Sequence, residues 1–267
     1  ASTGQHPEEI KRGVLIPLQK PGKPKGPTGN LRPIILLSAL RKVLAICLIG
    51  RIGSKVDARI PTTQAAYRSG RSTTEQVFTL KLMAEKAISF TNYTTHILML
   101  DMSKAFDTID RGTMLNDLRT ILLPEELHLI KVLIEDVKLA VRVGDNTGSA
   151  FRTNIGTPQG DCLSPILFTL YLSKALQGET TDHPPELRHH NYDSRNKPYL
   201  IPKEISDHTY TIRRDYGTLI DLQYADDVCW VAGNCSHGVE MYKNKASELL
   251  TKRNLKINTS KTEEYII

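Results

Sequence analysis

The stretch Leu219-Ile-Asp-Leu-Gln-Tyr-Ala-Asp-Asp-Val-Cys-Trp-Val-Ala232 decides the architecture of this chain. Its two apolar runs, 219–224 and 228–232, flank Ala225-Asp-Asp227, which predicts two β-strands joined by a tight hairpin. Adjacent carboxylates on a turn repel each other, and a cation that neutralises them relieves the repulsion. A solvated Asp-Asp turn is the simpler interpretation of the dipeptide alone. The apolar flanks, however, favour strands in the middle of a sheet.

A third carboxylate ends another strand that reads as buried. The run Ile97-Leu-Met-Leu leads directly into Asp101, at the end of an expected strand 96–100. If Asp101 and Asp226 lie on neighbouring strands, they form an oxygen-rich site of the kind Mg²⁺ prefers, a few carboxylates plus waters and substrate phosphates. Two such ions, roughly 4 Å apart, hold the attacking and leaving oxygens of an in-line phosphoryl transfer.

The first quarter of the chain carries the opposite charge. Residues 10–74 contain thirteen Lys and Arg and one acid, Asp57, a net charge of +12 in a 267-residue chain whose total is +6. Most such runs are solvated faces, but beside a carboxylate site this one suits a lobe that contacts phosphates. The cations around one Pro- and Gly-rich turn, which could hold a triphosphate, are Lys20, Lys23, Lys25 and Arg32.

Composition narrows the class of protein further. Hydrophobic residues make up 40% of the chain and charged residues 24%, which excludes global disorder. Four cysteines without C-x-x-C spacing argue against a disulfide scaffold or a zinc ribbon and favour an intracellular protein with reduced thiols. The most apolar stretch is too short to span a bilayer, so no membrane partner is expected.

Hydrophobic periodicity predicts a mixture of helices and strands. The Pro- and His-rich segment 177–205 lacks periodicity and is expected to be a loop insertion. Helices are expected at 39–52, after the capping box Ser72-Thr-Thr-Glu75, from Leu127 to Val137, at 163–176 and at 239–249, and strand pairs within 13–37 and 140–153.

Six blocks, in chain order, resemble the fingers and palm of a reverse transcriptase, and their wording is most similar to the non-LTR (LINE-type) retrotransposon branch. They run from about residue 10 to the end, and six blocks in order are far more specific than any one. The blocks are Leu31-Arg-Pro-Ile34 and Gln64–Thr73 with Gln76 in the fingers, Asp101–Asp107 as motif A, Gly156–Pro165 as motif B, Tyr224–Asp227 as motif C and Leu255–Lys261 as motif D.

The resemblance implies an α+β right-hand polymerase fold. Fingers are expected at 1–95 and the palm at 96–267, with the hairpin 138–155 packing on the fingers. The thumb and the other domains of the parent polyprotein are expected to be missing from this chain.

The resemblance also assigns metal ligands. Asp101 and Asp226 match the two metal-bridging carboxylates, with the Met102 carbonyl as a further ligand. Asp227 matches a residue that catalysis needs but that contacts metal less directly. The implied cofactors are two Mg²⁺ ions, with Mn²⁺ as a substitute.

Further positions match groups that contact the substrates. Phe106 matches the steric gate that excludes a 2′-OH and so selects dNTPs; its alternative interpretation is simple core packing. Lys261 matches the motif D lysine near the leaving pyrophosphate or the triphosphate, and the alternative is an exposed lysine. The remaining assignments are Gln159 and Gly160 beside the incoming nucleotide, Lys20 and Arg32 on the triphosphate, and Arg68, Gly70 and Arg71 along the template, with Arg68 equally well read as an internal fork.

The implied activity is RNA-directed DNA polymerisation, in which a DNA primer 3′-OH is extended with dNTPs on an RNA template. Nuclear localisation would suit target-primed insertion. An RNA-dependent RNA polymerase is a first alternative, opposed by Phe106 as gate and by Ala225 where a Gly-Asp-Asp turn would carry glycine. A second is a catalytically silent or domesticated fragment that binds RNA or protein, opposed by the intact carboxylates.

Overall fold

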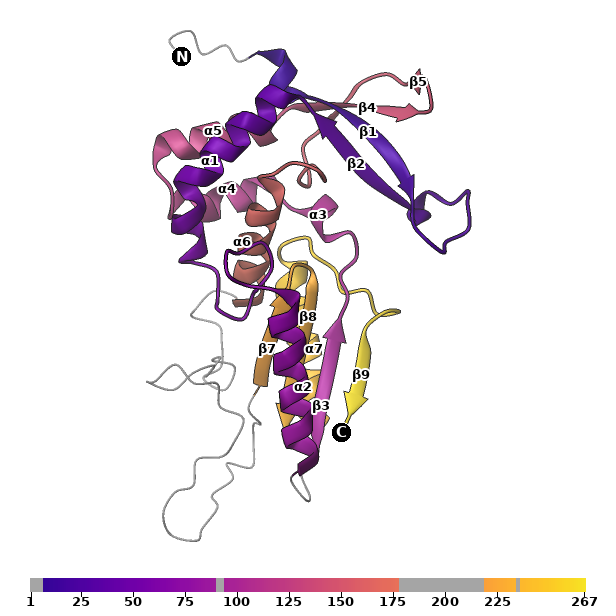
Figure 1. The fold of residues 1–267 in the computed structure, drawn as a ribbon, viewed down its shortest axis with the longest axis vertical. Coiled ribbons are helices and arrows are strands. Elements are labelled where there is room, and N and C mark those ends of the chain that lie inside the picture. Colours follow the sequence, from indigo (N-terminus) through magenta and orange to yellow (C-terminus); the bar gives the residue numbers. More distant parts are fainter. Residues whose placement is uncertain (1–6, 90–93, 178–218, 234–235) are drawn as a thin grey trace. The chain divides into compact units, whose positions relative to one another are not determined.

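The computed structural model describes residues 7–89, 94–177, 219–233 and 236–267 (Figure 1). The chain divides into two compact units. The first comprises Ala1–Ile60 and Lys104–Tyr171, and the second Pro61–Ser103 and Leu172–Ile267. The expected loop insertion 177–205 lies outside the described residues apart from Gln177. No helix in the described ranges is long and apolar enough to cross a membrane.

The first unit is built on a sheet with the strand order β2-β1-β4. Strands β1 (Arg12–Gln19) and β2 (Leu31–Leu37) form an antiparallel pair, so the basic loop between them is the expected hairpin connection. Strand β4 (Val137–Val143) pairs with β1 in parallel, and the short β5 (Asn146–Thr147) and β6 (Phe151–Thr153) fold back on β4. Leu15, Ile35, Leu37, Val137 and Leu139 form the apolar core of this sheet.

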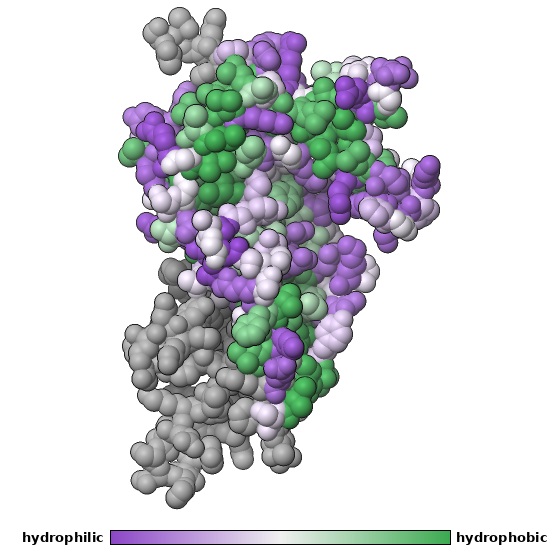
Figure 2. All heavy atoms as spheres, viewed as in Figure 1, coloured by the Kyte–Doolittle hydropathy of each residue, from purple (hydrophilic) through white to green (hydrophobic). Residues whose placement is uncertain are grey.

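Helices complete the first unit. Helix α1 (Ala39–Asp57) begins at Ser38, whose side chain accepts a hydrogen bond from the Arg41 amide, and it buries a stripe that includes Ala45, Leu48 and Ile52. Figure 2 shows further hydrophobic residues exposed over α1. The other elements are η1 (Glu8–Lys11), η2 (Thr28–Asn30), α3 (Ala105–Thr108), α4 (Arg111–Arg119), α5 (Pro124–Ile134) and α6 (Ser164–Gln177), whose last turns belong to the second unit.

The ends of helices α1 and α5 differ most from the sequence-based prediction. Helix α1 continues to Asp57, five residues beyond the predicted end. Helix α5 ends at Ile134, so the prediction of helix through Val137 was wrong. Glu135 is already extended where the helix ends, and Asp136 then adopts φ +55°, a left-handed conformation that turns the chain into β4. Val137 is buried as a strand residue, which is why its apolar spacing matched the helix pattern.

The second unit is an antiparallel sheet with the order β7-β8-β3-β9. Its strands are β7 (Leu219–Tyr224), β8 (Asp227–Gly233), β3 (Thr95–Leu100) and β9 (Glu263–Ile266). In Figure 1, α2 (Thr73–Ser89) crosses one face and α7 (Ser236–Thr251) lies behind the other. The α2 face is closed by a core of Met83, Ile97, Leu222, Cys229 and Val231. The Ser72 hydroxyl accepts from the Glu75 amide, which confirms the predicted N-terminal cap of α2.

Candidate active site

The sheet of the second unit brings the predicted carboxylates together. Strands β3 and β8 pair antiparallel with Leu100 opposite Val228. Asp101 directly follows β3, and Asp227 begins β8. Asp226 lies in the tight turn that joins β7 to β8. The prediction that Asp101 and the Asp226-Asp227 hairpin lie on neighbouring strands is therefore confirmed.

These carboxylates influence each other electrostatically. Burial raises the pKa of Asp226, and the charge of Asp101 raises it further, while Lys261 opposes the shift. The pKa of Asp227 is raised by burial and then by the charges of Asp226 and Asp101. Clustered negative charge of this kind favours a bound cation.

The donor atoms suit a hard cation, which takes oxygen ligands. In the described part of the chain no three His, Cys, Asp or Glu side chains converge into a complete metal site. A divalent ion would therefore depend on Asp101 and Asp226 together with other oxygens, such as the Met102 carbonyl, water and phosphate. This matches Mg²⁺, which commonly binds through one or two carboxylates plus substrate phosphates. Met102 itself is buried and forms an isolated bridge with Ile257.

Motif D closes over Asp101. The Lys261 ammonium lies 3.2 Å from Oδ2 and 3.4 Å from Oδ1 of Asp101, so this lysine is not an isolated surface residue. Asn258, to which sequence reasoning gave no role, donates its side-chain amide to Asp101 Oδ2 at 2.9 Å. Its backbone N–H also donates to the Asp101 carbonyl at 2.8 Å. The only sequence signal was an asparagine opening a turn.

The turn that carries Asp226 is held by a second residue that sequence reasoning gave no individual role. Ala225 adopts φ +55°. The fully buried Gln64 side chain accepts from the Ala225 amide at 3.1 Å and donates to the Ala225 carbonyl at 3.2 Å. Backbone bonds join Thr63 and Ala65 to Gln223 on β7. The segment around Gln64 thus clamps the hairpin from its edge and fixes the left-handed turn.

A cavity of about 600 Å³ lies beside the carboxylates within the second unit. Residues of α2, β3, β7 and β8 line it, and Asp101, Asp227 and Lys261 stand among them. Met99 and Val77 contribute apolar surface that is 40% and 65% exposed. The site thus combines a charged end with an apolar wall.

Motif B belongs to the first unit and is tied to strand β2. The Gln159 carbonyl accepts a hydrogen bond from the Ile35 amide at 2.7 Å. Gly160 has φ +111°, and a Cβ there would lie 2.6 Å from the Ile35 carbonyl oxygen. The close approach that glycine permits is therefore to the β2 backbone. Contact of Gly160 with a nucleotide stays a prediction.

The Gln159 side chain is oriented by motif A. Its amide donates to Asp107 Oδ1 at 3.0 Å. Burial raises the pKa of Asp107, while this hydrogen bond and the charges of Lys104 and Lys20 lower it. Lys20 also donates to the Gly29 carbonyl at 2.9 Å, so it is held within the basic loop. Within the described residues, the exposed side chain of Arg32 has no hydrogen-bond or ion-pair partner, although its backbone pairs with Leu18 in the β1–β2 hairpin.

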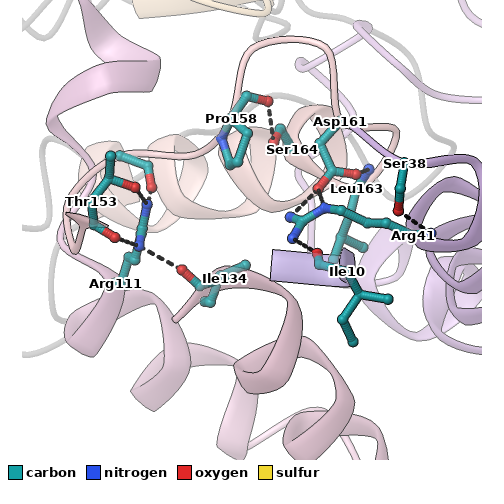
Figure 3. A network of polar contacts seen from close by, with 11 residues as sticks. Ile10, Ser38, Arg41, Arg111, Ile134, Thr153, Pro158, Asp161, Leu163 and Ser164 are labelled. Atoms are coloured by element: carbon teal, nitrogen blue, oxygen red, sulfur yellow. Dashed lines mark hydrogen bonds and ion pairs between the residues drawn. The ribbon is translucent and has the colours of Figure 1, made fainter. Parts of the chain in front are cut away.

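Buried arginines brace the motif B loop from both sides (Figure 3). Arg41 on α1 donates to Asp161 Oδ2 through Nε at 3.1 Å and Nη2 at 2.5 Å, and to the Ile10 carbonyl at 3.0 Å. Arg111 on α4 donates to the carbonyls of Ile134 and Thr153, and to that of Gly156 at 2.7 Å. The loop that carries Gln159 is therefore anchored at Gly156 and at Asp161.

Phe106 stacks on Phe168 of α6, with ring centroids 4.1 Å apart and an interplanar angle of 22°. The ring is half-buried, so packing fixes one face while part of the side chain stays accessible. Such a geometry is compatible both with the core-packing interpretation and with a rigid gate, and the gate stays a prediction.

The predicted template residues are largely used inside the second unit. Arg68 donates to the carbonyls of Pro61 and Gln64, at 2.8 and 3.0 Å, which favours its interpretation as an internal fork. Arg71 donates to the Thr62 carbonyl and pairs with Glu75 at 2.9 Å. Gly70 has φ +73° and open space where a Cβ would be. Template contact by these three residues stays a prediction.

The chain belongs to the family described as reverse transcriptase (RNA-dependent DNA polymerase), whose profile matches residues 18–266. Reverse transcriptases use divalent metal ions, in agreement with the carboxylate cluster. The family assignment confirms the resemblance to reverse transcriptases that the six sequence blocks indicated.

Several curated relatives are named as RNA-directed DNA polymerases of transposons and mobile elements. The probable RNA-directed DNA polymerase from transposon BS of Drosophila melanogaster is 25% identical over 258 residues, which cover 96% of this chain and 26% of the relative. The corresponding protein of the X-element of the same fly is 27% identical over 264 residues, 96% of this chain and 25% of the relative. This chain thus spans about a quarter of each.

Solved structures show the same mixed α/β fold. Apo telomerase from Candida tropicalis superposes with a TM-score of 0.64 at 13% identity, covering 99% of this chain and 46% of that one. Telomerase from the same yeast with a fragment of telomeric RNA gives a TM-score of 0.63 at 14% identity, covering 96% and 41%. At this identity the likeness concerns the fold alone.

Proposed function

We propose that this chain is the catalytic core of an RNA-directed DNA polymerase from a non-LTR retrotransposon. The observation that carries the proposal is the position of Asp101 at the end of β3, beside the Asp226-Asp227 hairpin. The substrates are an RNA template, a DNA primer and dNTPs, and the parent protein supplies the thumb and further domains. This part of the proposal is supported by the relatives, because this chain covers only 26% and 25% of their lengths.

In the proposed reaction the primer 3′-OH attacks the α-phosphate of a dNTP and pyrophosphate leaves. Two Mg²⁺ ions, for which Mn²⁺ can substitute, would polarise the attacking and leaving oxygens when bound. Asp101, Asp226 and the Met102 carbonyl would hold them, with Asp227 close by. Arg32 and Lys20 would neutralise the triphosphate, Arg32 by bidentate hydrogen bonds. Lys261 would move from Asp101 toward the pyrophosphate.

We also propose the subdivision of a right-hand polymerase, with fingers at 1–95 and palm at 96–267. The parallel pairing of β4 with β1 supports packing of the 138–155 hairpin against the fingers. Nuclear localisation, as target-primed insertion requires, is part of the same proposal.

Primer extension tests the activity. The 267-residue chain is given a labelled DNA primer on an RNA template with Mg²⁺, and dNTPs are compared with rNTPs. We expect DNA synthesis from dNTPs, and none from Asp226→Asn, which should still bind the primer–template. If neither chain extends the primer, the downstream segment of the parent polypeptide is added. Continued inactivity with intact binding would overturn the proposal in favour of a catalytically silent RNA-binding protein.

Sugar selection by Phe106 is a separate prediction. Phe106→Ala should raise the kcat/KM for rNTPs relative to dNTPs by roughly ten- to a hundredfold, since one small group in a fitted pocket is worth about that much. Single-nucleotide incorporation with dGTP and rGTP measures the ratio. The matched control is Phe151→Ala, which removes an exposed ring of β6 in the same unit. Unchanged selectivity in Phe106→Ala would contradict the gate and show that the Phe106 ring only packs in the core.

A further inference from the structure

We propose that Asn258 is a positioning residue that fixes the carboxylate of Asp101 for divalent-cation binding. The inference rests on the proposed function, because it concerns the same carboxylates. It adds a residue of motif D that acts on metal affinity through Asp101 and that need not contact substrate.

Asn258 holds Asp101 at two points. Its backbone N–H donates to the Asp101 carbonyl at 2.8 Å and its side-chain Nδ2 to Asp101 Oδ2 at 2.9 Å. A carboxylate held at its main chain and at one oxygen has lost most of its rotational freedom. Oδ1 is left without a bond to Asn258, and the Lys261 ammonium lies 3.4 Å from it. The amide therefore orients the carboxylate while one oxygen remains available to a cation.

The carboxylate of Asp101 determines the orientation of the Asn258 amide. A carboxylate only accepts hydrogen bonds, so the amide nitrogen faces Asp101 Oδ2, and Asn258 Oδ1 accepts from the Ser260 hydroxyl at 2.8 Å. The Asn258 carbonyl accepts from the amides of Lys261 and Thr262, at 3.1 and 3.0 Å, which closes the turn 258–261. The donor that reaches Asp101 is thus built into a short, well-bonded turn.

The two side chains that contact the Asp101 carboxylate, those of Lys261 and Asn258, differ in how they affect a metal ion bound there. Lys261 is a cation, 63% exposed, and it competes electrostatically with any metal ion at Asp101. The Asn258 amide is neutral and can keep its hydrogen bond when a cation binds the other oxygen. Groups that orient a metal ligand in this way typically account for about 10- to 100-fold in metal affinity. Asn258 is therefore the partner expected to favour metal binding.

Mn²⁺ binding to the 267-residue chain tests the assignment, followed by electron paramagnetic resonance of the free ion. We expect Asn258→Ala to weaken Mn²⁺ binding by about tenfold or more. Asn258→Ser should do the same, because serine preserves the turn chemistry but its side chain is too short to reach Asp101. The matched control is Thr259→Ala, at an exposed neighbour, which should bind Mn²⁺ as the unchanged chain does. Thermal unfolding of each variant reports whether the turn survives.

Asp101→Asn distinguishes a failure of the proposed metal site from a failure of the role assigned to Asn258. If Asp101→Asn loses Mn²⁺ binding while Asn258→Ala and Asn258→Ser retain it, Asn258 does not position the ligand and the inference is wrong. If Asp101→Asn itself binds Mn²⁺ normally, the proposed metal site fails and the inference fails with it. Weakened binding in both Asn258 variants, with normal unfolding temperatures, supports the assignment.

Discussion

Asp101→Asn should reduce templated nucleotide incorporation at least a thousandfold without unfolding the sheet that carries it. One well-placed cationic group on a transferring phosphoryl group is worth about 10³- to 10⁵-fold in rate, and loss of a metal ligand should cost no less. The substitution removes one negative charge but keeps the shape of the side chain. An amide is a poor ligand for a hard cation compared with a carboxylate.

The fold should tolerate this change because the contacts that it weakens are partly solvated. The side chains of Lys261 and Asp101 are 63% and 27% exposed, and exposed ion pairs contribute about 0–1 kcal/mol. The Asn258 amide can still donate to the remaining oxygen at position 101. Single-turnover extension gives the rate, and fluorescence anisotropy gives primer–template affinity. Asp145→Asn, at an exposed carboxylate between β4 and β5, is the control. Activity of Asp101→Asn within tenfold of the unchanged chain would contradict a metal-binding role.

Arg41→Met should destabilise the first unit by about 3–5 kcal/mol, because it leaves the Asp161 carboxylate buried without its partner. The side chains of Arg41 and Asp161 are 0% and 1% exposed, so water cannot replace the lost interactions. The Ile10 carbonyl loses its hydrogen bond as well. The expected consequence extends to Gln159 and Gly160, the residues proposed to contact the nucleotide, since Asp161 follows them in the same loop.

Hydrogen exchange of the α1 and α6 amides measures this loss within the first unit. Lys42→Met is the matched control, because Lys42 is the exposed neighbour of Arg41 on α1 and exposed substitutions typically stay within about 0.5 kcal/mol. The double variant Arg41→Met, Asp161→Leu should recover much of the stability, since an apolar pair needs no counter-charge. Equal protection in Arg41→Met and Lys42→Met would show that the ion pair contributes little.

The carboxylate hairpin was predictable because its signals are local. Apolar runs ending at Asp101 and flanking Ala225-Asp-Asp227 indicate strands, and the order of the six blocks indicates which strands meet. Asn258 and Gln64 were not assigned roles, because their contacts join residues 157 and 161 positions apart. Nothing in the neighbouring sequence marks such a partner.

The basic run at 10–74 was only partly understood from the sequence. A count of charges cannot distinguish a lysine that meets phosphate from one that meets protein. In the structure Arg41 pairs with Asp161, Lys55 lies 2.7 Å from Glu126, and Arg68 and Arg71 donate to backbone carbonyls. These cations stabilise their own units, whereas Arg32 remains exposed. The part of the run that is available to contact phosphate is therefore smaller than its net charge suggests.

Ile35 links two segments that the sequence separates by more than a hundred residues. Its amide is bonded to the Gln159 carbonyl, and its own carbonyl packs against Gly160 where no side chain would fit. The β1–β2 hairpin and the motif B loop are consequently joined through their backbones and should move together. If the basic end of the hairpin binds a triphosphate, as proposed, any displacement of β2 would reach the backbone of Gln159 through this hydrogen bond.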